Sequence, residues 1–210
     1  MPVVRYKLHL SPKSEVEQRE RDGHRPLDVV EAIRQRQSIR FFDPIHDVPH
    51  DIVVKLIELA TQAPSAGNIQ PWRFYVVRDP RIKMQLAKAA YGQTFLSEAP
   101  VVIVVCTDTE ASAKRYGRRG SHLYAIQDAA VATQTLMLAA EAEGLSTCWI
   151  GAFDEGAAAA VLNLERGERP TAIVPIGQAR TRRAKPGRKP LGEVMTLVVP
   201  APSAGPKQQE

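Results

Sequence analysis

The segment from Leu123 to Glu143 limits most strongly what this chain can fold into, because it predicts one long helix without a continuous polar face. Apolar residues occupy most of its circumference, namely Ala125, Ile126, Ala129, Ala130, Val131, Ala132, Leu136, Met137, Leu138 and Ala139. Such a helix is buried, either at the centre of a domain or against another subunit. Gly144, directly after it, predicts its C-terminal cap.

The length of 210 residues fits one globular domain that buries roughly two-thirds of its unfolded surface. The hydrophobic fraction of 44% and the charged fraction of 24% exclude a fibrous, wholly disordered or disulfide-framework protein. The longest apolar run, Pro100 to Cys106, is too short to cross a bilayer. Met1 to Leu10 is interrupted by Arg5, Lys7 and His9, unlike a secretory signal. We therefore expect a cytoplasmic protein without membrane contact.

Three sections are expected along the chain. Residues 1–25 are polar and charge-dense, which favours a mobile or surface-wrapped arm. Residues 26–199 contain the apolar patterns of a folded domain, and residues 200–210 have the composition of a disordered tail.

Helices and strands alternate within the domain. The predicted helices are Leu27–Arg36, Pro49–Thr61, Pro80–Ala90, Leu123–Glu143 and Asp154–Leu162. The predicted strands are Phe74–Val77, Val101–Cys106, Thr147–Ile150, Ala172–Ile176 and Met195–Val199, with Ser38–Phe42 extended. Val101–Cys106 has no alternating polar residue, so both of its faces are expected to be buried. The motifs GxGxxG, GxxxxGK[ST] and GxSxG are absent, which disfavours the enzyme classes that they mark.

Cysteine and histidine residues give no sign of a metal or redox centre. Cys106 and Cys148 are too far apart for a CxxC motif and are expected to be buried free thiols. His46, His50 and His122 lack metal-ligand spacing. The net charge of +5 suggests anionic partners, but charge alone does not separate a nucleic acid from a small phosphorylated ligand.

Arg36, Ser38 and Arg40 alternate at the period of an extended chain, so their side chains are expected to point to one side. Two guanidinium groups and a hydroxyl on one side are suited to a phosphate group. The same residues could equally form a solvated basic patch after a helix.

A second notable segment is APSAGNIQPW, from Ala63 to Trp72. Pro64, Gly67 and Pro71 predict irregular backbone that a ligand can approach closely. Asn68 offers both a donor and an acceptor, suited to sugar hydroxyls or to the edge of a flavin ring. Taken alone, the segment could also be only a helix stop followed by a turn.

Two further strings follow, CWIGAFDE at Cys148–Glu155 and GRKPLGEV at Gly187–Val194. The four motifs, in this order and with the long helix between them, resemble the nitroreductase family of FMN-dependent oxidoreductases. The resemblance runs from about Leu27 to Leu197. It implies an α+β fold with a central mixed or antiparallel sheet surrounded by helices, in an intertwined homodimer with two FMN sites at the subunit interface.

The resemblance also implies roles for the basic residues. Arg36, Ser38 and Arg40 match the strip that holds the FMN phosphate and ribityl chain, and Arg188 matches an arginine that closes on the same phosphate. This fits the local charge, since the range 169–192 has seven Lys or Arg residues and no Asp or Glu.

The flavin ring has its own implied contacts. Asn68 matches an asparagine on the flavin side of the site, and Pro64 and Ser65 match a loop that reaches the cofactor of the partner subunit. Ile150 and Gly151 match backbone that lies against the isoalloxazine ring, where an amide helps to stabilise the charge that arrives with the hydride.

The implied reaction is ping-pong hydride transfer from NAD(P)H through FMN to a nitroaromatic, a quinone or a similar flat acceptor. The cofactor supplies the chemistry, so no catalytic side chain is assigned. The string from Arg115 to Tyr124 falls where the acceptor pocket is commonly shaped. Arg115, Arg118 and Arg119 are interpreted as a solvated loop, with attraction of an anionic substrate as the alternative. Tyr91 and Tyr124 could line the pocket or simply pack.

Two other functions remain open. One keeps the fold but changes the flavin chemistry, to reductive dehalogenation or flavin breakdown; against it, the loop has Gln70 where the deiodinase-like pattern has Glu before Pro-Trp. The other is a non-enzymatic protein that binds nucleic acid through Arg180–Lys189, although no aromatic residues are interleaved there to stack on bases.

Overall fold

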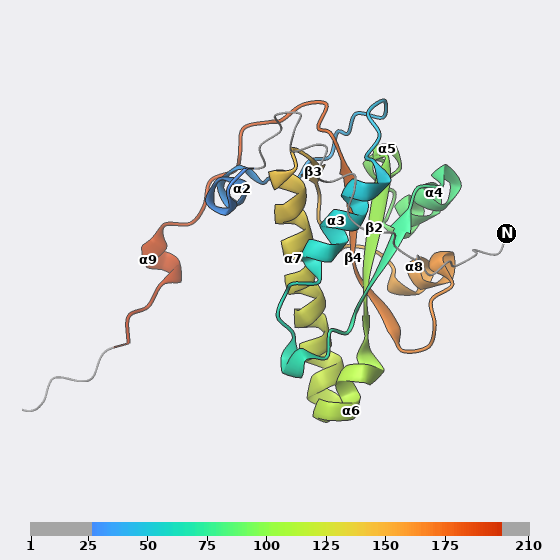
Figure 1. Ribbon diagram of the computed structural model, residues 1–210, viewed down its shortest axis with the longest axis vertical. Coiled ribbons are helices and arrows are strands. Elements are labelled where there is room, and N and C mark those ends of the chain that lie inside the picture. The colour runs from blue at the N-terminus through green and yellow to red at the C-terminus, as the bar shows by residue number, and fades with distance from the viewer. Residues whose placement is uncertain (1–26, 199–210) are drawn as a thin grey trace, which may run out of the picture.

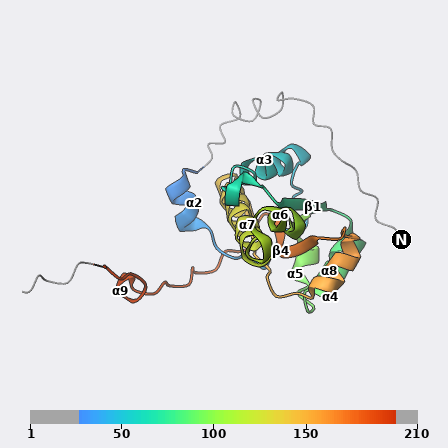
Figure 2. The same cartoon turned by 90° about the horizontal axis from the view of Figure 1, so that it is seen from below.

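The computed structural model describes residues 27–198. The predicted arm 1–25 and tail 200–210 lie outside the described residues, as do Pro26 and Val199. The described part is built on a four-stranded sheet with helices on both faces (Figures 1 and 2). This arrangement confirms the predicted α+β class.

The sheet has the strand order β1 (Trp72–Val77), β2 (Val101–Asp108), β4 (Glu168–Gly177) and β3 (Ser146–Thr147), and all of its pairings are antiparallel. In β2 the side chains from Val101 to Thr107 are buried, as expected for a strand covered on both faces. A register irregularity lies between Val105 and Cys106.

Alternate residues of β2 contribute to two separate hydrophobic cores. Val101, Ile103 and Val105 pack in the core that includes α3 (His50–Ala60) and α7 (Ala125–Ala142). Val102 and Val104 pack in the other core, with α4 (Pro80–Ala89), α5 (Phe95–Glu98) and α8 (Glu155–Leu162). The remaining helical elements are α2 (Val29–Gln35), η1 (Ala66–Asn68), α6 (Thr109–Arg119), η2 (Gly120–Tyr124) and α9 (Leu191–Val194).

The long helix α7 is central, as its apolar circumference predicts. It packs against α2, α3 and the sheet, and its buried residues lie on the covered faces (Figure 1). A stripe that includes Val131, 41% exposed, stays open in the single chain. The helix begins two residues later than predicted, after the π turn η2, and the chain reverses after it at Gly144, whose φ is 74°.

The structure corrects three predictions. Of the predicted strand 147–150, only Thr147 lies in a strand, β3 (Ser146–Thr147), and pairing resumes at Ile150 opposite Ile173. Residues 195–198 form no strand, because the segment 180–198 runs away from the sheet (Figure 1) and has no strand beside it. The string from Arg115 to Tyr124 is not a loop but the end of α6 and the turn η2.

Candidate functional site

Arg36, Ser38 and Arg40, which we call the arginine cradle, leave the C-terminal end of α2 along an extended backbone. Ser38 forms a parallel bridge with Thr147, and the N–H of Ile39 donates to the Thr147 carbonyl at 2.9 Å. Ile39 is buried while Ser38 and Arg40 are exposed, as the alternation predicts. The cradle therefore lies at the β3 edge of the sheet.

The cradle runs beside Cys148, the residue after β3, because Ser38 bridges Thr147. Burial raises the pKa of the Cys148 thiol, whereas the charge of Arg40, a hydrogen bond with Ser38 and the charge of Arg36 act in the opposite direction. All three cradle residues are thus close enough to Cys148 to act on it. Cys148 is a fully buried free thiol, as is Cys106, which confirms that prediction.

The backbone of Ile150 and Gly151 continues from the cradle along β4. Ile150 exchanges both of its backbone hydrogen bonds with Ile173, at 2.9 and 3.0 Å, and its side chain is buried. Gly151 is exposed, and within residues 27–198 its N–H makes no backbone hydrogen bond. The exposed Gly151 peptide therefore lies four residues after Thr147, the residue that Ser38 of the cradle bridges.

The loop Ala63–Trp72 is held by charged side chains from two helices. The N–H of Ala66 donates to Asp128 Oδ1 on α7 at 3.0 Å, and Arg115 Nη1 on α6 donates to the Gly67 carbonyl at 2.9 Å. Gly67 has a φ of 57°, and a Cβ there would lie 2.5 Å from the Tyr116 hydroxyl. Glycine is therefore favoured at this position by its backbone conformation, and any larger residue would displace the ends of the Tyr116 and Arg115 side chains.

Asn68 also has a left-handed backbone, with a φ of 55°. Its Oδ1 accepts from Gln70 Nε2 at 3.0 Å, and the Ser65 hydroxyl accepts from the Gln70 N–H at the same distance. Asn68 and Pro64 are exposed and Ser65 is half-buried. The loop thus presents polar groups at its surface on an ordered backbone.

The cradle and the loop lie at opposite ends of α7. Ala66 contacts Asp128 in the first turn, whereas Leu27, just before α2, donates to the Ala142 carbonyl at the last residue. At about 1.5 Å per residue, the rise from Asp128 to Ala142 is about 21 Å. A single chain therefore brings Arg36, Ser38, Arg40, Ile150 and Gly151 together but does not bring Pro64, Ser65 and Asn68 to them.

Arg188 lies in the segment 180–198, and among the described residues its guanidinium contacts only the carbonyls of Pro186 and Gly187, at 3.2 and 3.1 Å. Its predicted place at the phosphate stays a prediction. Nearby, Lys185 Nζ contacts the carbonyls of Ile33 and Arg34 in the last turn of α2, which attaches this segment to the helix that leads into the cradle.

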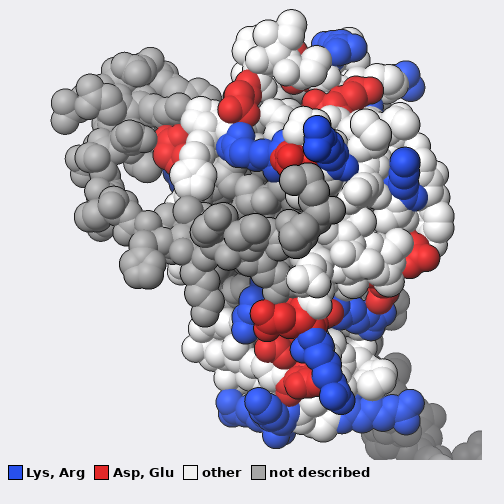
Figure 3. Space-filling model, turned by 90° about the vertical axis from the view of Figure 1, so that its right-hand side faces the viewer, with Lys and Arg blue, Asp and Glu red and all other residues white. Residues whose placement is uncertain are grey.

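Other cations of the range 180–189 are also engaged within the chain. Arg182 donates to the buried Glu141 carboxylate at 2.6 Å and to Ser146 Oγ at 3.1 Å, and Arg183 lies 5.1 Å from the Phe41 ring centroid. Figure 3 shows the side of the molecule away from the segment that leads to α9, and there too Lys and Arg side chains lie among Asp and Glu side chains. These contacts do not favour a free basic stripe for nucleic acid.

The remaining candidates are scattered. Tyr91 is 72% exposed beside the turn at Gly92, and His46 pairs with Asp43 at 2.9 Å. Within residues 27–198 no group of three histidine, cysteine or acidic residues could hold a metal ion. In the same range, every helix is too short or too polar to span a membrane.

The nitroreductase family model matches residues 33–95 and 85–178 of this sequence, which include the cradle, the loop, Ile150 and Gly151. The chain belongs to the nitroreductase family. This nitroreductase-family chain is 31% identical over 202 residues to "Protein DrgA" of Synechocystis, an alignment that covers 81% of this chain and 96% of the relative. It is 33% identical over 198 residues to an NADH dehydrogenase of Thermus thermophilus, with 80% and 95% covered.

Solved structures agree with this assignment. A nitroreductase family protein from Streptococcus pneumoniae superposes with a TM-score of 0.75 at 28% identity, over 81% of this chain and 100% of that one. A protein from Exiguobacterium sibiricum, solved in complex with FMN, has a TM-score of 0.74 at 24% identity, with 82% and 98% covered. The nitroreductase fold inferred from the sequence motifs is confirmed.

Sequence reasoning missed two charged residues of this nitroreductase that lie on α7. Asp128 is only 6% exposed and its Oδ2 has no hydrogen-bond partner, while Glu141 is 2% exposed and paired with Arg182. A carboxylate inside an otherwise apolar helix was the available signal, because burying a charge requires a specific partner or a function.

Proposed function

We propose that this protein transfers hydride from NAD(P)H through FMN to a flat acceptor, such as a nitroaromatic or a quinone, in a ping-pong cycle. Membership of the nitroreductase family makes it an oxidoreductase with FMN as cofactor and NAD(P)H as electron donor. The single observation that best supports the site is the arginine cradle beside the exposed peptide of Gly151.

The donor set of the cradle fits a phosphate group. Two guanidinium groups and one hydroxyl follow each other on the extended segment beside Thr147, and within residues 27–198 neither Arg36 nor Arg40 forms an ion pair with a carboxylate. Guanidinium groups that have no internal partner bind phosphate oxygens through paired charge-assisted hydrogen bonds. Arg36, Ser38 and Arg40 would hold the phosphate end of the cofactor, and Arg188 would add a further guanidinium.

FMN, when bound, supplies the acceptance of hydride from NAD(P)H and its delivery to the acceptor. The protein's own part is to bind, orient and polarise. The free N–H of Gly151 would donate to the ring edge where negative charge develops, and Ile150 fixes that peptide through its two bonds to Ile173. No side chain of the chain needs to act as acid, base or nucleophile.

We further propose that the enzyme is a homodimer whose sites combine two chains. The cradle and the Asn68 loop are at opposite ends of α7, so a second chain is the source from which Asn68, Pro64 and Ser65 would join a cradle. Apolar side chains of α2 are also uncovered in one chain, with Val29, Val30 and Ile33 between 51% and 65% exposed. An antiparallel partner would bury these side chains and complete both sites.

The first test is the visible absorbance spectrum of the purified protein, recorded before and after anaerobic addition of NADPH or NADH. We expect a flavin spectrum that bleaches with one or both donors. A colourless protein that does not take up added FMN would contradict the proposal. Restoration of the oxidised spectrum by a quinone or nitroaromatic, with FMN recovered intact, would exclude flavin breakdown.

The shared site is tested by mixing two defective proteins, Arg36→Ala/Arg40→Ala and Asn68→Ala, after unfolding and refolding them together. If each site uses the cradle of one chain and the loop of the other, half of the sites in mixed dimers are intact. Statistical mixing then restores about a quarter of the wild-type sites. Mixing would restore none if each chain supplied its own complete site.

A further inference from the structure

Four residues of α6 and η2 form a row of two rings with a cation at each end, which we call the Arg-Tyr ladder. The Arg115 guanidinium lies 5.4 Å from the Tyr116 ring centroid, the Tyr116 and Tyr124 rings meet edge to face at 5.2 Å, and Arg119 lies 5.3 Å from the Tyr124 ring. Arg119 Nε also donates to the Tyr124 hydroxyl at 2.9 Å. These contacts hold two long side chains in place before any ligand binds.

The backbone brings the two halves of the ladder together. The chain turns at Gly117, with φ 56° and ψ −143°, and then returns alongside α6. Gly120 lies so close to the Ser112 carbonyl that a Cβ would be 2.2 Å from its oxygen. This close approach places Tyr124 against Tyr116.

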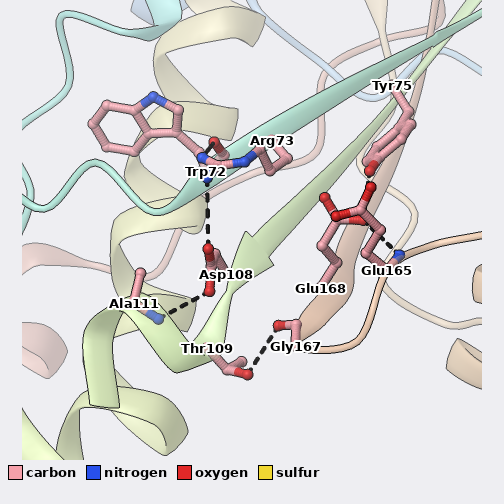
Figure 4. A network of polar contacts seen from close by, with 9 residues as sticks. All are labelled: Trp72, Arg73, Tyr75, Asp108, Thr109, Ala111, Glu165, Gly167 and Glu168. Carbon is pink, nitrogen blue, oxygen red and sulfur yellow. Dashed lines mark hydrogen bonds and ion pairs between the residues drawn. The ribbon is translucent and has the colours of Figure 1, made fainter. Parts of the chain in front are cut away.

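The start of α6 is anchored to the sheet by the polar network in Figure 4. Asp108 caps the helix by accepting from the Ala111 N–H at 2.9 Å and pairs with Arg73 at 3.5 Å. The Thr109 hydroxyl donates to the Gly167 carbonyl at 2.9 Å. The helix that carries Arg115 and Tyr116 is therefore fixed to the sheet at its N-terminal end.

The ladder also contacts the loop that carries Asn68. Arg115 donates to the Gly67 carbonyl, and the Tyr116 hydroxyl occupies the space beside the Gly67 Cα. The N–H of Asp108 donates to the Pro71 carbonyl at 2.7 Å, which joins the end of the loop to the base of α6. A molecule at the exposed surface of this loop would therefore meet the ladder.

Within the described part of the chain, no carboxylate neutralises the charge of the ladder and of the cations next to it. Between residues 111 and 127 there are four cations, Lys114, Arg115, Arg118 and Arg119, and no Asp or Glu. Elsewhere in the described part of the chain, Arg73, Arg78, Arg166, Arg169 and Arg182 each pair with a carboxylate. None of the four cations has such a partner within residues 27–198, and all four are exposed.

We propose that the Arg-Tyr ladder recognises the acceptor and selects flat molecules that carry a carboxylate or a similar oxyanion. The rings of Tyr116 and Tyr124 provide an aromatic surface, and Arg119 of the ladder, together with the neighbouring exposed Arg118, provides the charge. This inference deepens the proposed function and rests on it, because it names the acceptor class of the same site.

Two non-reducible ligands of matched shape test it, benzoate and neutral benzamide, titrated into the oxidised FMN-loaded protein by calorimetry. We expect wild-type protein to bind benzoate about tenfold more tightly, as charge-assisted hydrogen bonds allow. Arg118→Ala/Arg119→Ala should lose most of this preference. The control, Arg81→Ala/Lys88→Ala, removes two exposed charges from α4 and should retain it.

Tyr124→Phe keeps the ring but removes the hydroxyl that holds Arg119, and we expect it to lose part of the preference. Equal binding of the two ligands by wild-type protein, or an equal loss of both in the ladder variant, would overturn the inference. NADP⁺ and NAD⁺ are titrated in parallel, because the phosphate of the donor is another oxyanion. A change confined to the NADP⁺-to-NAD⁺ ratio would assign the ladder to the donor and overturn its role in acceptor choice.

The proposed function fails separately, by the absence of bound FMN or of bleaching with NAD(P)H. Catalytic measurements then add a second readout. The ratio of kcat/KM for 4-nitrobenzoate over 4-nitrobenzyl alcohol should fall in the ladder variant and stay at the wild-type value in the α4 control.

Discussion

The two ends of α7 present two differently built polar surfaces. At the C-terminal end, the arginine cradle follows an extended backbone beside β3, and its guanidinium groups pair with no carboxylate among residues 27–198. At the N-terminal end, the Asn68 loop is held by Asp128 and Arg115, and its polar groups are already bonded to one another. The guanidinium groups of the cradle are therefore predicted to bind an anion, whereas the internal hydrogen bonds of the loop fix its backbone conformation.

The largest expected effect is at the cradle. Arg36→Ala/Arg40→Ala should raise the Kd for FMN by at least about a hundredfold, since each charge-assisted contact contributes about 1.5–3 kcal/mol. Fluorescence titration of the flavin-free protein measures this change. Arg34→Ala, in the last turn of α2 two residues before Arg36 and exposed, is the control and should bind FMN normally.

The double variant Arg36→Ala/Arg188→Ala extends this test to the C-terminal segment. It should stay folded but lose FMN on dialysis, because both guanidinium groups are predicted to contact the phosphate. Full retention of flavin by this variant would remove both residues from the phosphate site.

The next largest effect concerns stability at the same end of α7. Arg182→Ala leaves the buried Glu141 carboxylate without its partner, and we expect a loss of about 2–3 kcal/mol in the free energy of unfolding. Urea denaturation measures it. Arg183→Ala removes only a cation–π contact with Phe41 and should cost less than about 1 kcal/mol. Equal losses of unfolding free energy in the two variants would show that the Arg182–Glu141 ion pair contributes no more than the cation–π contact.

At the loop end, stability is expected to depend on the backbone conformation of Gly67 and on the space beside it. Gly67→Ala should destabilise the protein by about 2 kcal/mol, because the new Cβ collides with Tyr116 and Arg115 and the positive φ is strained. Gly92→Ala has similar strain, with a φ of 80°, but open space around it, and should cost about 1 kcal/mol. The difference in Tm between the two variants, measured by thermal unfolding, separates the cost of the side-chain collision from the cost of the positive φ.

The smallest expected effect is a gain in stability, at Asp128. Burial raises the pKa of Asp128 above its usual value of 3.8, against the smaller opposite effect of the Ala66 N–H. The folded protein therefore favours the protonated carboxyl, and this contribution to stability is lost as pH rises through the raised pKa. Asp128→Asn keeps an oxygen for the Ala66 N–H and removes the charge.

We expect Asp128→Asn to be more stable than wild type by about 1 kcal/mol at neutral pH, with the advantage shrinking as the pH falls toward 4. Tm values measured from pH 4 to pH 8 test this, with the exposed Glu58→Gln as the control. A variant less stable than wild type at pH 7 would show that the Asp128 charge is needed.

The sequence predicted the secondary structure well where periodicity is strong. Three elements fit only one type of secondary structure: α3 by its apolar stripe, β2 by its unbroken apolar run, and α8 by the Asp154 cap. The prediction of a strand at residues 195–198 was wrong, because their apolar side chains fit a strand although residues 27–198 offer them no strand partner. Local pattern does not tell whether the neighbour that it needs belongs to the same chain.

The site shows the same limit. The period-two spacing of Arg36, Ser38 and Arg40 was sufficient to predict that they share a side, since extended geometry is local. That Asn68 lies at the other end of α7, and that Asp128 and Arg115 hold its loop, depends on contacts between residues 48 and 62 positions apart. Only the fold supplies such contacts.

The alternation of β2 between two cores has a consequence for mutational scanning. In a half-exposed strand such as β1, tolerance to polar substitution follows the partly exposed positions between Trp72 and Val77. In β2 each residue from Val101 to Cys106 packs in one of the two cores. A saturation library should therefore show no alternating pattern of positions that tolerate polar residues. Selection for improved variants is therefore best directed at the two ends of α7, leaving this strand unchanged.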